Sequence, residues 1–205
     1  MIFFSLPNFF TSFGINNLLL ETNRLSPEVF KEKIAFENCS GNFPYCSWNG
    51  GMNNCMGEGA YYEAFLSCYK GNASPLRLNF ANVCLENTDF YDSMANAILD
   101  TNDNGSNIIE ISNLELMDYI HTQYPNYNFV FSKQADLITE FTPELINTII
   151  GMDKFILIGI PDKYYKDFDW LQQIDKKSKI ELTVNPMCPI NCKNYANCHI
   201  QEHEF

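Results

Sequence analysis

Residues Lys154–Ile160 read KFILIGI, a nearly continuous apolar run. Such a run is expected of a strand that is covered on both faces, as in a parallel sheet with helices packed against it. Six further short runs predict strands of the same sheet, at Met1–Leu6, Lys33–Glu37, Leu76–Phe80, Asn107–Ile111, Asn128–Phe131 and Ile180–Val184.

Segments with helical character separate these strands. The expected helices cover Phe13–Asn23, Ser26–Lys33, Tyr61–Lys70, Asp89–Asp100, Leu114–Tyr124, Thr142–Gly151 and Phe168–Asp175. Ser26, Thr88, Asn113 and Thr142 stand where helix N-caps belong, and Pro27 and Pro143 follow two of them at first helical positions. Strands that alternate with helices imply βαβ crossovers and a parallel sheet.

Seven such units predict an α/β fold with a parallel (βα) barrel-like sheet of the TIM type, whose eighth unit is incomplete. A doubly wound open sheet is the alternative, but the chain has no GxGxxG loop to support it. No domain boundary is visible, so residues 1–205 are expected to form one domain, with a cysteine-bearing C-terminal segment over 185–205.

The composition excludes some classes of function. The chain has 205 residues and a formal net charge of −12, and a charge of this sign repels the phosphates of nucleic acids. We therefore expect no autonomous nucleic-acid binding. Residues 1–20 are apolar, but the first basic residue is Arg24 and Pro7 interrupts the run, so neither a signal peptide nor a membrane span is expected. The sequence predicts a cytoplasmic protein.

Small polar residues end most of the predicted strands. In a parallel barrel these carboxyl ends share one face, on which the site is built. Each such residue could instead cap the following helix. The expected substrate-binding residues on this face are Trp48, Asn49, Asn82, Asn185 and Glu37. Trp48 could stack on a planar ligand or plug the barrel. Glu37 and Glu110 could act as an acid–base pair at the mouth, or hydrogen-bond to neighbouring loops.

Eight cysteines suggest metal chemistry. Cys188, Cys192 and Cys198 fall within eleven residues after the last predicted strand. Thiolates bind iron–sulfur clusters and zinc, and this spacing matches no common zinc-finger pattern. The alternatives are reduced structural cysteines or one disulfide.

The fourth ligand is expected from a loop at the same face. Cys46, after the second strand, is the first choice, and Cys39, Cys84 and His199 are the alternatives. A site with His199 would hold zinc rather than a cluster.

Two segments carry a family resemblance. The segment Asn185–Cys192 resembles the N-x-x-C-x-x-x-C segment of the collagenase-like peptidase (U thirty-two) family. The segment Ser40–Gly51 resembles the YGSFP-x-C-x-WNGG loop of uncharacterised barrel proteins from gut bacteria and their phages. Two positions depart from that loop: Ser40 replaces its tyrosine, and Met52 replaces the arginine that follows its glycines.

The resemblance implies a barrel fold and a 4Fe-4S cluster with one early ligand, Cys46, and three late ligands, Cys188, Cys192 and Cys198. The implied function is an oxygen-independent modification enzyme or its accessory subunit. Two alternatives stay open. The chain could be a binding or structural protein of phage or bacterial origin, with zinc or without a cofactor, or it could be a hydrolase that uses Cys46. The substrate and the partners are not readable from the sequence.

Overall fold

A computed structural model of the chain describes residues 2–30, 33–43, 45–49, 60–184, 193–194, 197–198 and 200. Its seven strands are β1 (Ile2–Leu6), β2 (Ile34–Gly41), β3 (Leu76–Phe80), β4 (Ile108–Ile111), β5 (Asn128–Phe131), β6 (Phe155–Gly159) and β7 (Ile180–Glu181). They form one sheet in the order of the chain, and every neighbouring pair is parallel. This sequential order is the pattern of a barrel, so the predicted α/β barrel-like class is confirmed.

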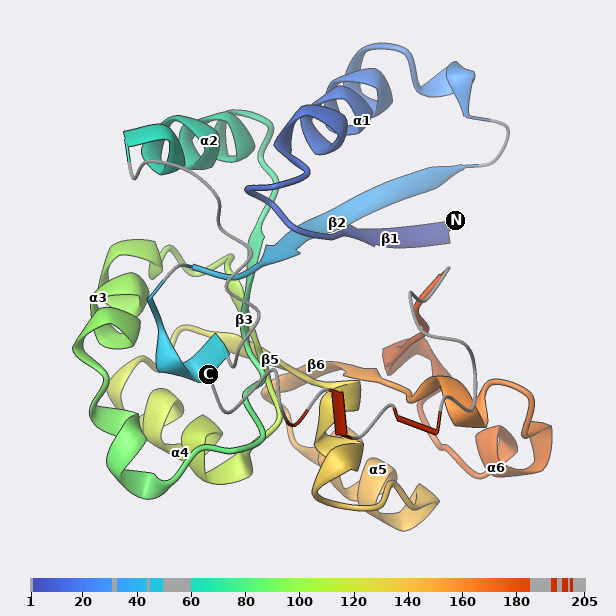
Figure 1. Cartoon of the computed structure of the whole chain (residues 1–205). Helices are drawn as coiled ribbons and strands as arrows, with labels where there is room; N and C mark the ends of the chain where they lie inside the picture. The colour runs from blue at the N-terminus through green and yellow to red at the C-terminus, as the bar shows by residue number, and fades with distance from the viewer. Residues whose placement is uncertain are drawn as a thin grey trace.

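The helices lie on the outer side of the curled sheet (Figure 1). They are α1 (Phe13–Leu25), α2 (Ala60–Gly71), α3 (Ser93–Asn102), α4 (Leu114–Gln123), α5 (Pro143–Gly151) and α6 (Phe168–Gln172). Short 3-10 turns join them to the strands: η1 (Pro27–Val29), η2 (Ser47–Asn49), η3 (Asn87–Tyr91), η4 (Lys133–Leu137), η5 (Asp162–Tyr164) and η6 (Lys177–Lys179). None of the helices in the described ranges has the length and apolar character needed to cross a bilayer.

The main core lies between the sheet and these helices. Alternate residues of β3 and β4 face it, because successive side chains of a strand point to opposite sides. Leu78, Phe80, Ile109 and Ile111 are fully buried there against residues of the surrounding helices. The side chains on the other side of each strand point into the interior of the curled sheet. The helices do not pack there, so polar side chains can occupy this interior.

The sheet is a half-barrel, since β1 and β7 are its two edges. Side chains connect these edges in place of a backbone ladder: Ser5 Oγ donates a hydrogen bond to Glu181 Oε1 over 2.9 Å. The first and last strands therefore face each other across the interior, which is the position an eighth strand would fill in a complete barrel.

Several predicted bounds were wrong. The second strand was expected to end at Glu37, but β2 continues to Gly41 because Cys39–Gly41 pair with β3. The last strand is shorter than predicted and ends at Glu181. The helix expected over Asp89–Asp100 is two elements, η3 and α3, and the predicted cap Thr88 lies inside η3. The helix expected over Ser26–Lys33 is only the short turn η1.

Asp92 causes the break between η3 and α3. Its carboxylate accepts hydrogen bonds from the N–H groups of Met94 and Ala95, which makes it the N-cap of α3. Ser47 also donates to it, through its backbone N–H and its hydroxyl. Partial burial pushes the pKa of Asp92 upward, but these hydrogen bonds outweigh it and hold the pKa below its ordinary value.

Gly41 is required by close packing at the end of β2. A Cβ atom there would lie 2.8 Å from Cδ1 of Phe9 and 2.9 Å from the backbone nitrogen of the same residue. Gly14, near the start of α1, has open space at the same position. Substitution by alanine is therefore expected to lower the stability of the fold at Gly41 but not at Gly14.

Candidate functional site

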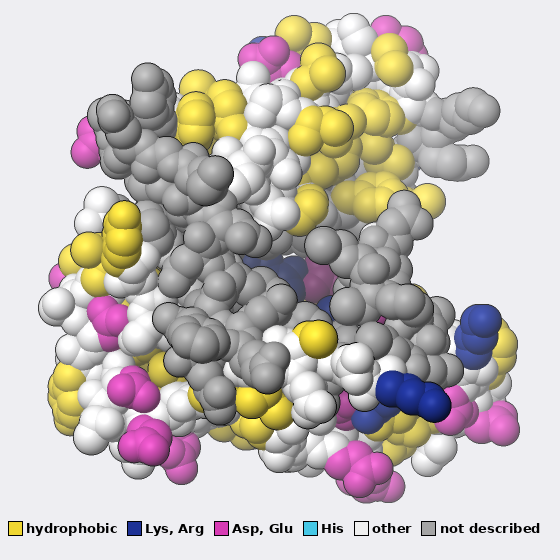
Figure 2. All heavy atoms as spheres, viewed as in Figure 1, with side chains coloured by type: hydrophobic (Ala, Val, Ile, Leu, Met, Phe, Trp, Pro, Cys, Tyr) yellow, Lys and Arg dark blue, Asp and Glu magenta, His cyan; other side chains and the backbone are white. Residues whose placement is uncertain are grey.

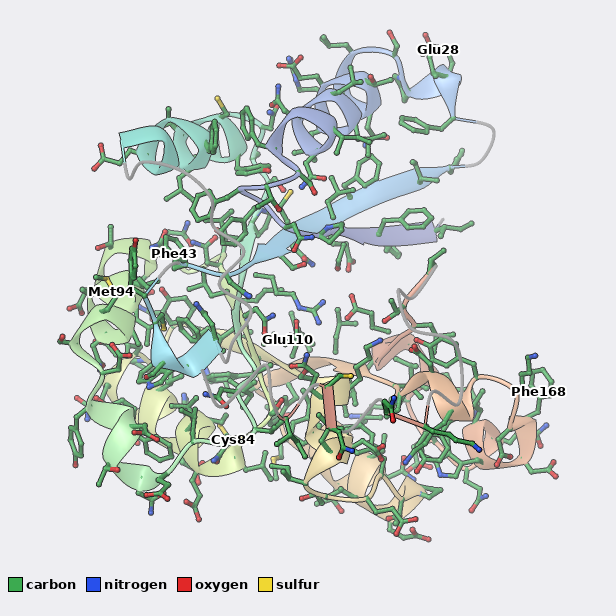
Figure 3. The ribbon with its side chains drawn as sticks, viewed as in Figure 1. Glu28, Phe43, Cys84, Met94, Glu110 and Phe168 are labelled. Carbon is green, nitrogen blue, oxygen red and sulfur yellow. The ribbon has the colours of Figure 1, made fainter. Side chains whose placement is uncertain are left out.

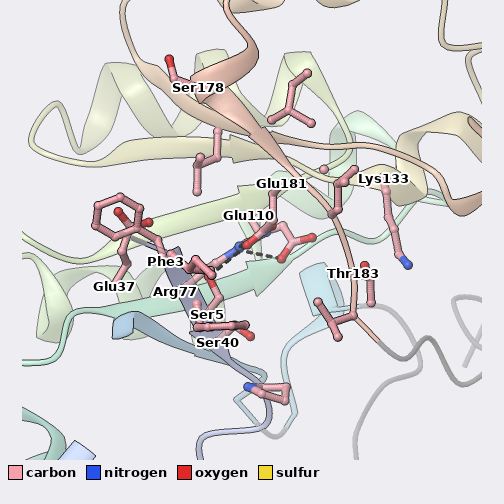
Figure 4. A pocket seen from close by; sticks show the side chains of 18 residues that line it. Phe3, Ser5, Glu37, Ser40, Arg77, Glu110, Lys133, Ser178, Glu181 and Thr183 are labelled. Carbon is pink, nitrogen blue, oxygen red and sulfur yellow. Dashed lines mark hydrogen bonds and ion pairs between the residues drawn. The ribbon is translucent and has the colours of Figure 1, made fainter. Parts of the chain in front are cut away.

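A pocket of about 660 Å³ occupies the interior of the half-barrel. Residues from β1, β2, β3, β4, β6 and β7 line it, so nearly the whole sheet contributes. Figure 2 shows a hollow near the centre of the molecule, with basic and acidic side chains on its floor. The polar side chains that line the pocket are Ser5, Glu37, Ser40, Arg77, Glu110, Lys133, Ser178, Glu181 and Thr183 (Figure 4).

Arg77 lies at the centre of this polar lining. Its neighbours in β3, Leu76 and Leu78, are buried, and the alternation of the strand turns Arg77 to the opposite face. Its Nη1 lies 2.7 Å from each carboxylate oxygen of Glu181, and its Nε lies 3.0 Å from Oε2 of Glu110. The Nε contact is an ion pair whose geometry falls short of a hydrogen bond.

The two carboxylates keep Arg77 charged. Burial alone would lower the pKa of the guanidinium, but the negative charges of Glu110 and Glu181 and the hydrogen bond to Glu181 outweigh it and raise the pKa. Hydroxyl groups hold the carboxylates in turn, because Ser132 Oγ donates to Glu110 over 2.7 Å and Ser5 Oγ donates to Glu181. The cluster is therefore a fixed arrangement that joins β1, β3, β4 and β7.

Glu37 and Glu110 both lie in this pocket, as expected for carboxylates of the barrel interior. Glu37 is exposed, and no cation contacts it within the described part of the chain. Figure 3 shows Glu110 at the centre of the molecule, whereas Glu28 and Phe168 lie at its periphery. At one end of the pocket Lys133 Nζ pairs with Asp162 over 3.1 Å.

Trp48 and Asn82 lie near the carboxyl ends of β2 and β3, but they contact each other rather than the pocket. Trp48 is fully buried, and its Nε1 donates to the carbonyl of Asp89 over 2.8 Å. The backbone N–H of Asn82 donates to the carbonyl of Trp48, and its Nδ2 donates to that of Ser47. Asn49 is also buried and donates to the carbonyl of Phe43. This placement favours the plug over the ligand-stacking role for Trp48. The substrate-binding role of these residues stays a prediction.

The described cysteines differ in exposure. Cys46 and Cys39 are buried, whereas Cys68, Cys84 and Cys198 are exposed. Burial raises the pKa of Cys46 to about 12, although backbone N–H groups of Trp48 and Asn49 hydrogen-bond its sulfur and act in the opposite direction. Burial also raises the pKa of Cys39, against the effect of a hydrogen bond with Ser74.

The other predicted ligands lie outside the described residues. These are Cys188, Cys192 and His199, together with the substrate candidate Asn185. Among the residues that the structure does describe, no three His, Cys, Asp or Glu side chains are arranged to hold a metal ion. The four-cysteine cluster site therefore stays a prediction.

Sequence reasoning missed Arg77 and Glu181. Both have a recognisable signal, since each is a charged residue between apolar neighbours in a predicted strand of a sheet covered by helices. A charge at such a position is expected to face the barrel interior, where partners from other strands can neutralise it. Their pairing could not be predicted, because it depends on the curl of the whole sheet.

Comparisons of the chain with models of protein families, with curated proteins and with solved structures gave no match. The resemblance to the collagenase-like peptidase family stays an expectation from the sequence.

Proposed function

We propose that the chain binds a small organic molecule in the half-barrel pocket. The observation that carries this proposal is the cluster of Arg77, Glu110 and Glu181 inside a concave site. Burying charges is costly, and apolar side chains of similar size are often at least as stabilising as a buried ion pair. A charged cluster inside a pocket is therefore better explained by ligand recognition than by stability.

The rigidity of the cluster supports the same function. The strands fix the backbone of Arg77, Glu110 and Glu181, and the hydroxyls of Ser5 and Ser132 orient the carboxylates. A ligand that meets groups already held in position loses less entropy on binding. The apolar part of the lining, which includes Phe3, Leu157 and Ile180, can cover the remainder of such a ligand.

A screen of small-molecule fragments, monitored by nuclear magnetic resonance, tests this proposal. Small molecules that bind are expected to shift the backbone resonances of pocket residues such as Ser5 and Glu181. Leu157→Trp, which enlarges a side chain of the lining, is expected to weaken this binding at least tenfold. Leu18→Trp is the matched control, because Leu18 is exposed on α1. Equal binding by Leu157→Trp and the native chain would contradict the proposal.

An iron–sulfur function is the second candidate, and one observation at Cys46 favours it. The N–H groups that hydrogen-bond its sulfur would stabilise a thiolate, the form that binds a metal. With Cys188, Cys192 and Cys198 as further ligands, a bound cluster would supply electron transfer. Burial nevertheless raises the pKa of Cys46, so without a metal the thiol stays protonated, and this disfavours the alternative of a cysteine-dependent hydrolase, which needs an activated thiolate. A bound metal would itself remove the proton from a coordinating thiol. The cytoplasmic location stays a prediction.

Iron and sulfide analysis after anaerobic reconstitution tests this second candidate. About four irons per chain are expected in the native protein, and a loss of iron in Cys46→Ala. Cys68→Ala is the control, because Cys68 is exposed on α2. One zinc per chain without iron would support the zinc-stabilised alternative, and an iron content unchanged in Cys46→Ala would exclude Cys46 as a ligand.

A further inference from the structure

We propose that the half-barrel pocket recognises an organic cation, namely a primary ammonium group on an apolar body. This inference rests on the proposed binding function and adds the chemical class of the ligand. Three properties of the pocket support it: its balance of charge, the groups that a ligand can reach, and its apolar lining.

The charge of the lining is negative. Glu37, Glu110 and Glu181 face the interior, and Arg77 is the cation that contacts the last two. The other basic side chain, Lys133, is paired with Asp162. One guanidinium therefore opposes three carboxylates. In a partly enclosed site, where water screens charges weakly, this excess attracts a cation.

The exposure of each group decides which charge a ligand meets. The Arg77 side chain is only 5 % exposed, whereas the Glu110 and Glu181 side chains are 17 % and 26 % exposed. Glu37 is exposed as well. In Figure 4, Phe3 and Glu37 lie at one side of the pocket and Lys133 at the other, with Arg77, Glu110 and Glu181 between them. Within the cluster the guanidinium is thus covered, and the carboxylate oxygens are its accessible charged atoms. Lys133, which is 23 % exposed, is the accessible cation at the other side of the pocket, where it pairs with Asp162.

An ammonium group matches these accessible carboxylates. It has three donors and no acceptor, so its N–H groups can pair with oxygens of Glu37, Glu110 and Glu181, which all line the pocket. A hydroxyl offers a single donor and no charge, and a carboxylate would be repelled by the same groups.

The apolar lining indicates what the ammonium is attached to. Phe3, Phe4, Leu157, Ile180 and Leu182 border the same pocket. They provide a surface for an aliphatic or aromatic body, and an aromatic ring can also contact the cation directly. A hydrophobic amine therefore fits the pocket better than a sugar or a phosphate ester does.

Calorimetric titration with three probes of similar shape tests this inference. The probes are 2-phenylethylamine, 2-phenylethanol and 3-phenylpropionate. The amine is expected to bind about tenfold more tightly than the alcohol, which is the typical effect of a charge-assisted hydrogen bond. The carboxylate is expected to bind more weakly than both.

Two variants complete the test. Glu37→Gln is expected to weaken amine binding severalfold, and Glu28→Gln, on the exposed turn η1, is expected to leave it unchanged. Preference for the carboxylate, or no binding of the amine at millimolar concentration, would overturn the cation inference. If Leu157→Trp abolished binding of whichever probe the native chain prefers, the proposed binding function would still be supported, because the probe would bind in the pocket. Amine binding that Leu157→Trp leaves intact would instead refute the proposed site.

Discussion

Replacing Arg77 by methionine tests the account of the pocket most directly. Methionine has a similar length and no charge, so Arg77→Met removes the guanidinium while retaining much of its volume. Glu110 and Glu181 would then lie in the interior without a cation, with side chains only 17 % and 26 % exposed. The variant should lose stability because two partly buried carboxylates lose their partner.

The size of the loss follows from the contacts. A charge pair about 4 Å apart is worth roughly 4 kcal/mol at an effective dielectric constant of about 20, and Arg77 forms two such pairs. Burial of the guanidinium costs several kcal/mol, and this cost disappears in the variant. We expect a net decrease of about 3–5 kcal/mol in the free energy of unfolding, which is typical when one partner of a buried pair is removed.

Urea unfolding, followed by the fluorescence of the buried Trp48, measures this change. Arg24→Met is the control, because Arg24 is exposed on α1 and its loss should change stability by less than about 0.5 kcal/mol. Adding Glu110→Gln and Glu181→Gln to Arg77→Met should restore most of the loss, since no unpaired charge would remain. A decrease below about 1 kcal/mol in Arg77→Met would refute the reasoning.

Three further predictions concern the framework around the pocket. Asp92→Ala should cost about 1–2 kcal/mol at pH 7, as expected for loss of a helix cap. Because the pKa of Asp92 is lowered in the folded protein, its contribution is present above about pH 4 and lost as the pH falls further; equal urea midpoints for variant and native chain at pH 7 would contradict this. In the metal-free protein at pH 8, iodoacetamide should modify exposed Cys68 readily and Cys46 only after unfolding, as peptide mass spectrometry would show; equal rates would mean that Cys46 is not buried. Gly41→Ala should lower stability by about 1–3 kcal/mol through overpacking, whereas Gly14→Ala should be neutral or stabilising by up to about 1 kcal/mol. Thermal unfolding of the two variants compares them, and a reversed order would contradict the close contact at Gly41.

Much of the fold could be predicted from the sequence because its signals are local. The strands at Leu76–Phe80 and Asn128–Phe131 have the predicted bounds, since each is a short run between turn residues. Asn113 and Thr142 cap α4 and α5 as expected, because a cap depends on residues two or three positions away. Alternation of these strands with helices was enough to predict a parallel, sequentially ordered sheet.

The pocket, in contrast, was decided only by the tertiary structure. Arg77 is 104 residues from Glu181, and Ser5 is 176 residues from it. No local pattern reports which charges will meet over such separations, because their meeting depends on the register of every strand pair and on the curl of the sheet. The same long-range packing extended β2 beyond its predicted end and buried Trp48. Local propensities thus set the strands and helices, and the closure of the half-barrel brought their inward-facing charges together.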